Sequence, residues 1–289
     1  CMISDNTATG VPEHWFDPVG GGGMYLAAEA TLFNCTIMGN SAHCGGGVYF
    51  CGYSHLTNCM IFNNTANHDG GGVYSFSSGL MTNCIIWANR PEAIKSLRGG
   101  PGVTYCDVQG GWEGTGNIDV DPGFAFPGDY HLLSTSPCVD AGTNNPVSGL
   151  PATDSDGQPR SLDGDGDGQA VADIGVDEFD PATPTLALGA TTLAISARMG
   201  QTGSQTLEFR NCSLSTMAWE VQSEADWLTV DPPAGQSVGE AVTTVTVTAD
   251  ATNLAYGTYV TRLWVDADQA CSSPQQVTVV VYATRASHV

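Results

Sequence analysis

An acidic run in the middle of the chain has the residue types and the spacing of a calcium-binding loop. Residues 163–168 read DGDGDG, so Asp163, Asp165 and Asp167 alternate with glycine. Alternating carboxylates followed by a glycine form the first half of such a loop, because Ca²⁺ takes about six to eight oxygen ligands. The second half departs from the pattern. Ile174 stands where a bidentate acid is expected, and Asp173 comes one residue early.

Acidic residues outside the run could complete the ligand shell. Asp154, Asp156 and Asp177 are the candidates in the sequence. We predict a structural calcium ion as the cofactor of this chain. The residues predicted to hold it are Asp163, Asp165, Asp167, Asp173 and Asp156. The alternative interpretation is a solvated acidic turn that binds no ion.

Side chains that could perform acid–base chemistry are few and scattered. The charged candidates are Asp69, Arg90, Glu92, Lys95 and Arg98. The histidines in the same region are His43, His55 and His68. A further group that could form a pocket is Trp112, Asp119, Asp121, Asp129 and His131. Polysaccharide hydrolases need paired carboxylates, and lyases need a calcium-bound carboxylate with a basic group. The sequence indicates neither cluster, and we predict no catalytic residues.

The elements that must position these side chains come from a sequence repeat. The motif NCxIxxN occurs at 34–40, 58–64 and 83–89, so its cysteines are spaced 24 and 25 residues apart. Glycine triplets at 21–23, 45–47 and 70–72 keep the same phase. The segments between are short, alternating and rich in β-branched and aromatic residues, which indicates strands. We predict a right-handed parallel β-helix in which each turn, or rung, takes one repeat.

In such a stack, equivalent residues of successive rungs lie directly above one another. The predicted inward-facing cysteine ladder is Cys1, Cys35, Cys59, Cys84 and Cys106. A second ladder, predicted at a bend where asparagine tolerates a left-handed backbone, is Asn6, Asn40, Asn64 and Asn89. Side chains stacked in register are too far apart for disulfide bonds, so we expect free thiols within the cysteine ladder. Cys44 and Cys51 lie outside it and could pair with each other.

Composition and charge exclude several classes of function. The chain has 8 basic and 30 acidic residues, which gives a net charge of −22. Because phosphate recognition needs a basic face, we expect no nucleic-acid partner, and an anionic membrane surface is disfavoured for the same reason. No apolar run approaches the ~20 residues of a membrane span.

Cysteine usage points to an exported protein. The chain has ten cysteines and one lysine but no CxxC pair, so a zinc site of the usual spacing is not expected. We predict an extracellular or cell-surface location. The sequence shows no signal peptide and begins in mid-repeat at Cys1, so we interpret it as a mature or truncated piece of a longer protein.

The repeat region resembles a known group of surface proteins. The runs NCTIMGNSA, GGGVYF and LTNCMIFNNTA are similar to the right-handed β-helix repeats of bacterial extracellular and outer-membrane proteins, including the polymorphic outer-membrane protein type. Residues 103–142, 153–160 and 173–179 resemble the end of such a helix in the choice-of-anchor class. The resemblance covers roughly residues 1–180. It implies a fold more than an activity, because these proteins include enzymes, adhesins and passive surface proteins.

The last third of the chain has a different pattern. After a linker rich in proline, threonine and alanine come strand-like runs separated by turns, which predicts a β-sandwich of immunoglobulin type. The stretches WLTVDPPAG (227–235) and VTTVTVTADATNLAYGTY (242–259) resemble the BACON family of small bacterial sandwiches. That resemblance implies either carbohydrate or mucin contact or a spacer role. Within such a sandwich we expect a disulfide between Cys212 and Cys271, and Trp219 and Trp227 in the core.

These observations predict an all-β protein with four segments. They are a parallel β-helix at 1–142, an acidic capping region at 143–180, a linker at 181–189 and a BACON-like sandwich at 190–289. We expect a non-enzymatic structural or adhesive surface protein that forms part of a larger assembly or contacts carbohydrate. One alternative is a fragment or accessory domain of a polysaccharide lyase or hydrolase. The other is a carbohydrate-binding module that uses the row Tyr25, Tyr49 and Tyr74.

The partners expected for this protein follow from the β-helix. Its end near Cys1 would expose unpaired strand edges, so we expect self-association or docking of other surface proteins there, and polysaccharide as a possible ligand. If the isolated chain were strictly monomeric with its first rung intact, the expectation of self-association would fail.

Overall fold

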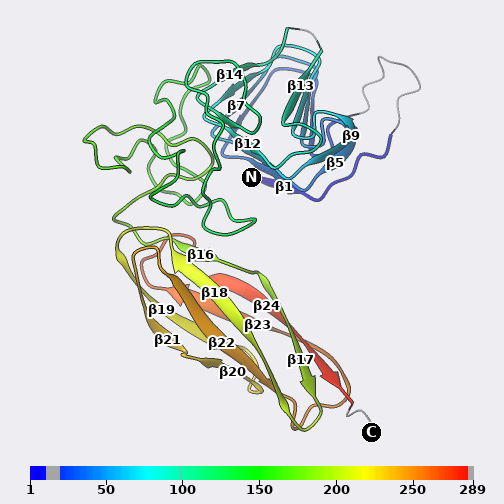
Figure 1. The fold of residues 1–289 in the computed structure, drawn as a ribbon, viewed down its shortest axis with the longest axis vertical. Coiled ribbons are helices and arrows are strands. Elements are labelled where there is room, and N and C mark those ends of the chain that lie inside the picture. The colour runs from blue at the N-terminus through cyan, green and yellow to red at the C-terminus, as the bar shows by residue number, and fades with distance from the viewer. Residues whose placement is uncertain (11–19, 98, 286–289) are drawn as a thin grey trace. The chain divides into compact units, whose positions relative to one another are not determined.

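A computed structural model describes residues 1–10, 20–97 and 99–285 (Figure 1). The described residues form strands, turns and loops and contain no helix, so they also contain no helix that could span a membrane. The chain divides into two compact units. The first comprises residues 1–123 and 135–179, and the second comprises residues 124–134 and 180–289.

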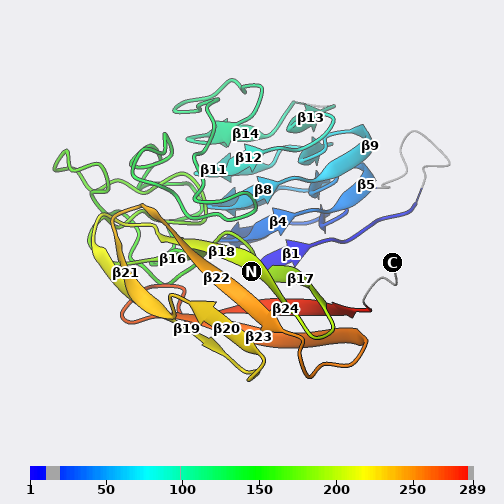
Figure 2. The same ribbon diagram turned by 60° about the horizontal axis from the view of Figure 1, so that its bottom comes forward.

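The first unit is a parallel β-solenoid whose strands stack into four ladders (Figure 2). The first ladder consists of β1 (Met2–Ser4), β4 (Thr36–Met38), β8 (Met60–Phe62), β12 (Ile85–Trp87) and β15 (Asp107–Val108). The second consists of β2 (Met24–Leu26), β6 (Val48–Phe50), β10 (Val73–Ser75) and β13 (Ile94–Ser96). The third consists of β3 (Ala30–Phe33), β7 (Ser54–Thr57), β11 (Leu80–Thr82) and β14 (Gly102–Thr104). The fourth pairs β5 (Ser41–Cys44) with β9 (Thr65–Asp69).

The repeat period sets the register of these ladders. Ile37 of β4 lies opposite Ile61 of β8, and Val48 of β6 lies opposite Val73 of β10. The predicted all-β fold with a parallel solenoid is therefore confirmed. Inward-facing residues of successive rungs form one continuous apolar core, because each rung can bury its inner face only against its neighbours.

The cysteines of the repeat line this core. Cys35, Cys59, Cys84 and Cys106 are buried in it, whereas Cys1 is exposed. The buried thiols donate hydrogen bonds to the carbonyl two residues earlier, as Cys84 Sγ does to Thr82 O at 3.3 Å. Burial raises the pKa of Cys84 well above its ordinary value, so the thiol stays protonated.

The asparagines at the end of each motif form a hydrogen-bonded ladder. Asn64 Oδ1 accepts hydrogen bonds from the backbone N and from Nδ2 of Asn40, at 2.9 and 3.0 Å. Asn64 Nδ2 in turn donates to Ile37 O and to Asn89 Oδ1. The same pattern joins Asn6 to Asn40. The amides of Asn40 and Asn64 thus bond both to the preceding rung and to the next one.

The prediction that the ladder asparagines adopt a left-handed backbone was wrong. The ladder asparagines do not adopt the left-handed backbone; Asn34, Asn58 and Asn83, which directly precede the cysteines, do so with φ of 49° to 53°. One bend therefore lies directly before each cysteine. A second left-handed position lies directly before each ladder asparagine, at Asp5, Gly39, Asn63 and Ala88. The contribution of the ladder asparagines is therefore their side-chain hydrogen bonds and not an unusual backbone conformation.

The glycine triplets form a corner where backbones of successive rungs approach closely. A Cβ added to Gly46 would lie 2.4 Å from Thr65 O, and one added to Gly71 would lie 2.0 Å from Arg90 O. Side chains are therefore excluded at the middle glycine, which explains its recurrence in each repeat.

Residues 140–179 run as a strap along the solenoid, over the bends formed by the left-handed asparagines. Asn83 Nδ2 donates to Thr143 O at 2.9 Å, and Asn58 Nδ2 donates to Asp173 O at 3.0 Å. Asn34 Nδ2 donates to Thr153 O at 2.7 Å. The asparagine before each cysteine thus holds the strap in place on three successive rungs.

The second unit is a sandwich of two sheets. One sheet consists of β16 (Leu186–Leu188), β18 (Thr202–Asn211), β22 (Val242–Asp250) and β20 (Leu228–Asp231). The other consists of β17 (Thr192–Arg198), β24 (Gln275–Thr284), β23 (Gly257–Ala267), β19 (Thr216–Ser223) and β21 (Ala234–Val238). Apart from the parallel pair β17–β24, the strands are antiparallel.

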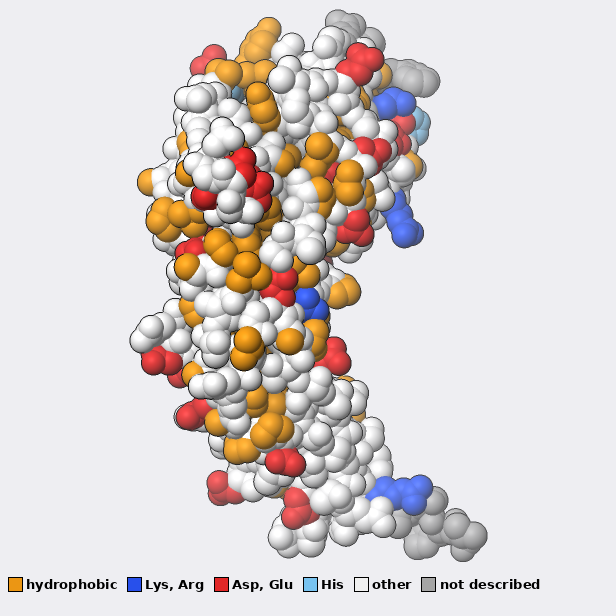
Figure 3. Space-filling view, turned by 60° about the vertical axis from the view of Figure 1, so that its left-hand side comes forward, with side chains coloured by type: hydrophobic (Ala, Val, Ile, Leu, Met, Phe, Trp, Pro, Cys, Tyr) orange, Lys and Arg blue, Asp and Glu red, His pale blue; other side chains and the backbone are white. Residues whose placement is uncertain are grey.

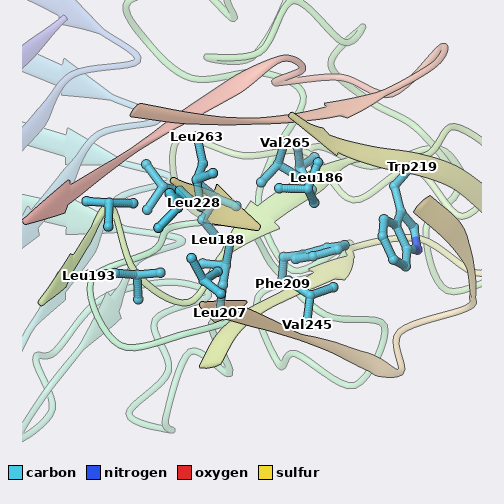
Figure 4. Close-up of a cluster of buried hydrophobic side chains, with 14 of the residues drawn as sticks. Leu186, Leu188, Leu193, Leu207, Phe209, Trp219, Leu228, Val245, Leu263 and Val265 are labelled. Atoms are coloured by element: carbon cyan, nitrogen blue, oxygen red, sulfur yellow. The ribbon is translucent and has the colours of Figure 1, made fainter. Parts of the chain in front are cut away.

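Strict alternation builds the core of this sandwich. In β17 every second residue is buried, and the inner faces of both sheets meet in one apolar cluster (Figure 4). Trp219 is buried there with its ring edge-on to Phe209, the centroids 5.0 Å apart, and Trp227 packs against the same cluster. Both tryptophans therefore serve packing, and the predicted sandwich is confirmed.

Candidate functional site

The strap gathers three carboxylates at one end. Ligand oxygens of Asp140, Asp163 and Asp165 all lie within 4.8 Å of one another. Asp163 and Asp165 belong to the DGDGDG run, whereas Asp140 comes from the start of the strap. Oxygen donors converging from two separate segments are the kind of arrangement that Ca²⁺ uses.

Hydrogen bonds within the strap hold these carboxylates in place. Asp140 Oδ2 accepts a bond from the backbone N of Asp165 at 2.8 Å, and Asp163 Oδ2 accepts one from the backbone N of Gly168 at 3.0 Å. Among the described residues, Asp163 Oδ1 is buried and has no hydrogen-bond partner. Burial raises the pKa of Asp140, and the charge of Asp165 acts in the same direction. A bound cation would offset both effects, so the residues present fit calcium.

The other predicted ligands lie elsewhere in the strap. Asp167 closes a turn by accepting bonds from the backbone N and from Nε2 of Gln169. Asp173 is buried and accepts bonds at 2.7 Å from the backbone N of Asp140 and of Phe179. Asp156 donates its backbone N to Asp154 Oδ1. The structure thus brings together two of the five predicted residues and adds Asp140, which the sequence pattern did not indicate because it lies more than twenty residues upstream.

A buried ion pair fixes the middle of the strap. Arg160 Nη1 lies 3.2 Å from Glu178 Oε2 and donates to Asp177 O, and Arg160 Nη2 donates to Asn34 Oδ1 at 2.9 Å. Breaking such a pair would leave an uncompensated buried charge. The ion pair and the bond to Asn34 therefore hold the strap in one position on the first repeat.

A cavity of about 330 Å³ opens on the outer face of the third ladder. It is lined by Glu29, Ala30, Thr31, Tyr53 and His55. Thr31 of β3 and His55 of β7 are in register on adjacent rungs, and Tyr53 precedes β7 with 66% of its surface exposed. An exposed aromatic ring thus stands beside one carboxylate and one imidazole.

The charged turn residues gather at a different corner. Asp69 at the end of β9 lies 3.4 Å from Lys95 Nζ and 2.9 Å from His68 Nδ1. Glu92 Oε1 accepts a bond from the backbone N of Gly70. Both carboxylates are thus engaged in structural contacts, and Arg98 lies outside the described residues. Figure 3 shows how sparse basic side chains are on one face of the molecule.

The expected pocket around Trp112 divides between the two units. Trp112 packs against the solenoid core, while Asp119 and Asp121 accept backbone hydrogen bonds from Gly110 and Gly123. In the second unit, Nδ1 of buried His131 donates a hydrogen bond to Asp129 Oδ1 at 2.7 Å. Each of these side chains has a structural partner within its own unit.

The tyrosine row forms a stack in which each ring packs against the next. Tyr49 stacks between Tyr25 and Tyr74 with centroid distances of 5.2 and 5.1 Å. Tyr49 and Tyr74 are each only 7% exposed. Tyr49 is covered on both sides, whereas Tyr25 at the end of the row is 39% exposed, so the row serves mainly packing.

The candidate disulfide cysteines lie as follows. Cys44 ends β5, and Cys51 follows β6; both are half-buried thiols in the structure. Cys212 is buried and donates its backbone N to Thr185 O, and Cys271 bridges to the same residue. Both pairings stay predictions.

Comparison with known proteins adds one family match. Residues 185–278 match the family described as "Viral BACON domain". No curated protein matches the chain.

Three solved structures are each weakly similar to about a third of the chain. The ASH / PapD-like domain of human CEP192 is 12% identical, with a TM-score of 0.32, covering 36% of this chain and 88% of that chain. A putative carbohydrate binding protein from Bacteroides ovatus is 12% identical, with a TM-score of 0.30, covering 35% and 37%. A family 123 glycoside hydrolase from Clostridium perfringens is 9% identical, with a TM-score of 0.31, covering 36% and 28%. This chain thus spans about a third of the lengths of the latter two. Residues 185–278 of the second unit are thus similar to a BACON domain, and the first unit is a β-solenoid.

Proposed function

We propose that this chain is a non-enzymatic protein of the cell exterior that contacts neutral carbohydrate through its solenoid. The observation that carries the proposal is the open cavity beside Tyr53. Ligand sites combine an aromatic or apolar surface with a few convergent polar groups. Glu29 and His55 supply such groups for sugar hydroxyls, and β3 and β7 hold them on a rigid surface.

The charge of the protein supports a neutral ligand. A net charge of −22 repels acidic polysaccharides, and Glu29 adds a negative group to the cavity itself. The cavity lining contains one carboxylate, whereas glycoside hydrolysis ordinarily uses two, about 5 to 9.5 Å apart. The lining therefore supports binding better than cleavage.

Calorimetric titration of the full chain with neutral and acidic oligosaccharides tests this proposal. We expect a neutral glycan to bind and Tyr53→Ala to weaken its binding at least tenfold. Tyr256→Ala is the matched control, because Tyr256 is 63% exposed and belongs to the second unit. Equal binding by both variants would contradict the role of the cavity. Shortened polysaccharide chains after incubation with protein and calcium would contradict the non-enzymatic assignment.

We also propose that Asp140, Asp163 and Asp165 hold a structural calcium ion that ties the start of the strap to its acidic run. Support comes from the converging oxygens and from the buried, unpartnered Asp163 Oδ1. An ion that binds only the folded state stabilises it by RT ln(1 + [L]/Kd), which is about 2 kcal/mol at thirty times Kd.

Thermal unfolding with and without calcium tests this second proposal. We expect calcium to raise the Tm of the solenoid by roughly 4 to 8 °C. Asp163→Asn should abolish the rise. Asp167→Asn removes the same charge from the same loop but lies outside the cluster, so it should retain the rise. A calcium effect lost equally in both variants would instead indicate diffuse charge screening.

A further inference from the structure

We propose that His43, Cys44 and His68 form a binding site for Zn²⁺ at the corner between β5 and β9. The three side chains offer two imidazole nitrogens and one thiol sulfur, all within 4.8 Å of one another. This donor set differs from the oxygen-only cluster of the strap. Imidazole and thiolate are the ligands that Zn²⁺ prefers, whereas Ca²⁺ prefers oxygen.

An irregularity in the β5–β9 ladder assembles the site. Ala42 lies opposite Ala66, but the register then shifts so that Cys44 lies opposite Asp69. The extra residue in β9 brings His68 alongside His43, and the two rings stack with centroids 5.3 Å apart and planes inclined by 27°. The strands lie side by side in both ribbon views (Figures 1 and 2).

The distances are within reach of coordination. Zn–N bonds of about 2.0 Å and Zn–S bonds of about 2.3 Å place tetrahedral ligand atoms roughly 3.5 Å apart. Closing from 4.8 Å requires rotations of side chains only. His68 is mainly solvent-exposed, at 57% of its side chain, and can turn without disturbing the core. Three protein ligands would leave a fourth position for water.

Metal sites usually include a group that orients a ligand histidine through its other ring nitrogen, and Asp69 is placed to do this for His68. Asp69 Oδ2 lies 2.9 Å from His68 Nδ1, which leaves Nε2 of that ring as the nitrogen available to an ion. Metal-bound histidines usually hold a carboxylate at the other ring nitrogen, because this contact orients the ring. Lys95 Nζ lies 3.4 Å from Asp69 Oδ1 and positions the carboxylate in turn.

The local electrostatics favour a cation over a bare thiol. The carboxylates of Asp69 and Glu92 place negative charge around the sulfur of Cys44, and this charge favours a divalent cation there. A divalent ion would bind the thiolate and release its proton. The site requires Cys44 in its reduced form and therefore competes with the predicted Cys44–Cys51 disulfide.

Cobalt(II), a spectroscopic substitute for zinc, tests the proposal on the reduced full chain. A cobalt–thiolate bond gives an intense charge-transfer absorption that imidazole or carboxylate ligands do not. We expect this band at one equivalent of Co²⁺ and its disappearance when Zn²⁺ is added. Cys44→Ser and His68→Asn should each abolish it, and Asp69→Asn should weaken zinc affinity about 10- to 100-fold.

Two variants separate this site from the other cysteines and histidines. Cys51→Ser removes a second half-buried thiol, and His55→Asn removes a half-buried imidazole on another ladder. Both should retain the band with full intensity. Exposed His68 makes His68→Asn a variant that keeps the fold, which far-ultraviolet circular dichroism would verify. Absence of the band in the wild type, or its persistence in Cys44→Ser, would overturn the proposal.

Discussion

The solenoid and the sandwich bury their interiors by different means. Asparagine side chains of the solenoid run from rung to rung in a buried, hydrogen-bonded ladder beside thiols and aliphatic residues. The sandwich core consists of aliphatic and aromatic side chains, together with one methionine. A stack of short strands leaves backbone groups at every bend, and these need polar partners. Long antiparallel strands satisfy their own backbone and need only apolar faces.

This contrast implies that removing a buried polar side chain should lower the unfolding free energy of the solenoid most. Truncating a large apolar side chain should have the same effect on the sandwich. Because the chain has two units, unfolding is best followed as two transitions, each assigned by its response to single substitutions.

The largest effect is expected from Asn64→Ala. The substitution removes four hydrogen bonds and leaves the backbone N of Asn40 and the carbonyl of Ile37 buried without their partners. We expect a loss of about 5 kcal/mol in the unfolding free energy of the solenoid, measured by urea titration. Asn67→Ala, an exposed residue of β9, should change it by less than about 0.5 kcal/mol. Similar small losses for both would contradict the ladder.

A slightly smaller effect is expected from Phe209→Ala in the sandwich. Phe209 is fully buried against Trp219, so truncation leaves a cavity that costs about 4 kcal/mol. The loss should appear only in the transition of the second unit. Tyr282→Ala on the outer face of β24 is the control and should cost much less, because this side chain is exposed. A shift of the solenoid transition by Phe209→Ala would show that the two units unfold together.

The smallest effect is expected from the ionisation of Asp107, a buried carboxylic acid of the solenoid. Asp107 is fully buried beside Cys138 Sγ, and burial raises the pKa of Asp107 to about 7. The folded state thus favours the neutral acid. Its contribution is fully present below about pH 4, where the unfolded acid also stays protonated, and is lost as the pH rises from 4 towards 7.

Asp107→Asn tests this sign. Relative to the variant, the wild-type solenoid should lose about 3 kcal/mol between pH 4 and pH 7. Denaturant titrations of both proteins across this range measure the difference and cancel the effect of the overall charge. A difference that is flat with pH would show that Asp107 ionises normally. The sandwich transition should respond equally in both proteins.

Much of the fold could be predicted from the sequence, because equivalent residues of a repeat are neighbours in the folded solenoid. Residues spaced 24 or 25 apart, such as Cys59 and Cys84, must be stacked if each rung takes one repeat. Alternation in runs such as residues 192–198 likewise gives the inner and outer faces of a strand. The asparagine before each cysteine also recurs, yet its function was not evident, because its partner is the non-repetitive strap.

The candidate sites followed much less well. The DGDGDG run was visible, but Asp140 joins it only because the strap folds back on itself. His43 and His68 are 25 residues apart and occupy equivalent positions before two glycine triplets, but the register shift between Ala42 and Cys44 is not visible in the sequence. The cavity beside Tyr53 exists only where two rungs meet.

The sequence by itself determined the two kinds of β architecture, because hydrophobic period and repeat length are local properties of the chain. The tertiary structure alone decided which polar side chains meet. Ligand sets such as Asp140 with Asp163, or Cys44 with His68, join residues across separate turns. Their distances depend on how the backbone bends and shifts between strands, and a pattern of residue types does not specify that geometry.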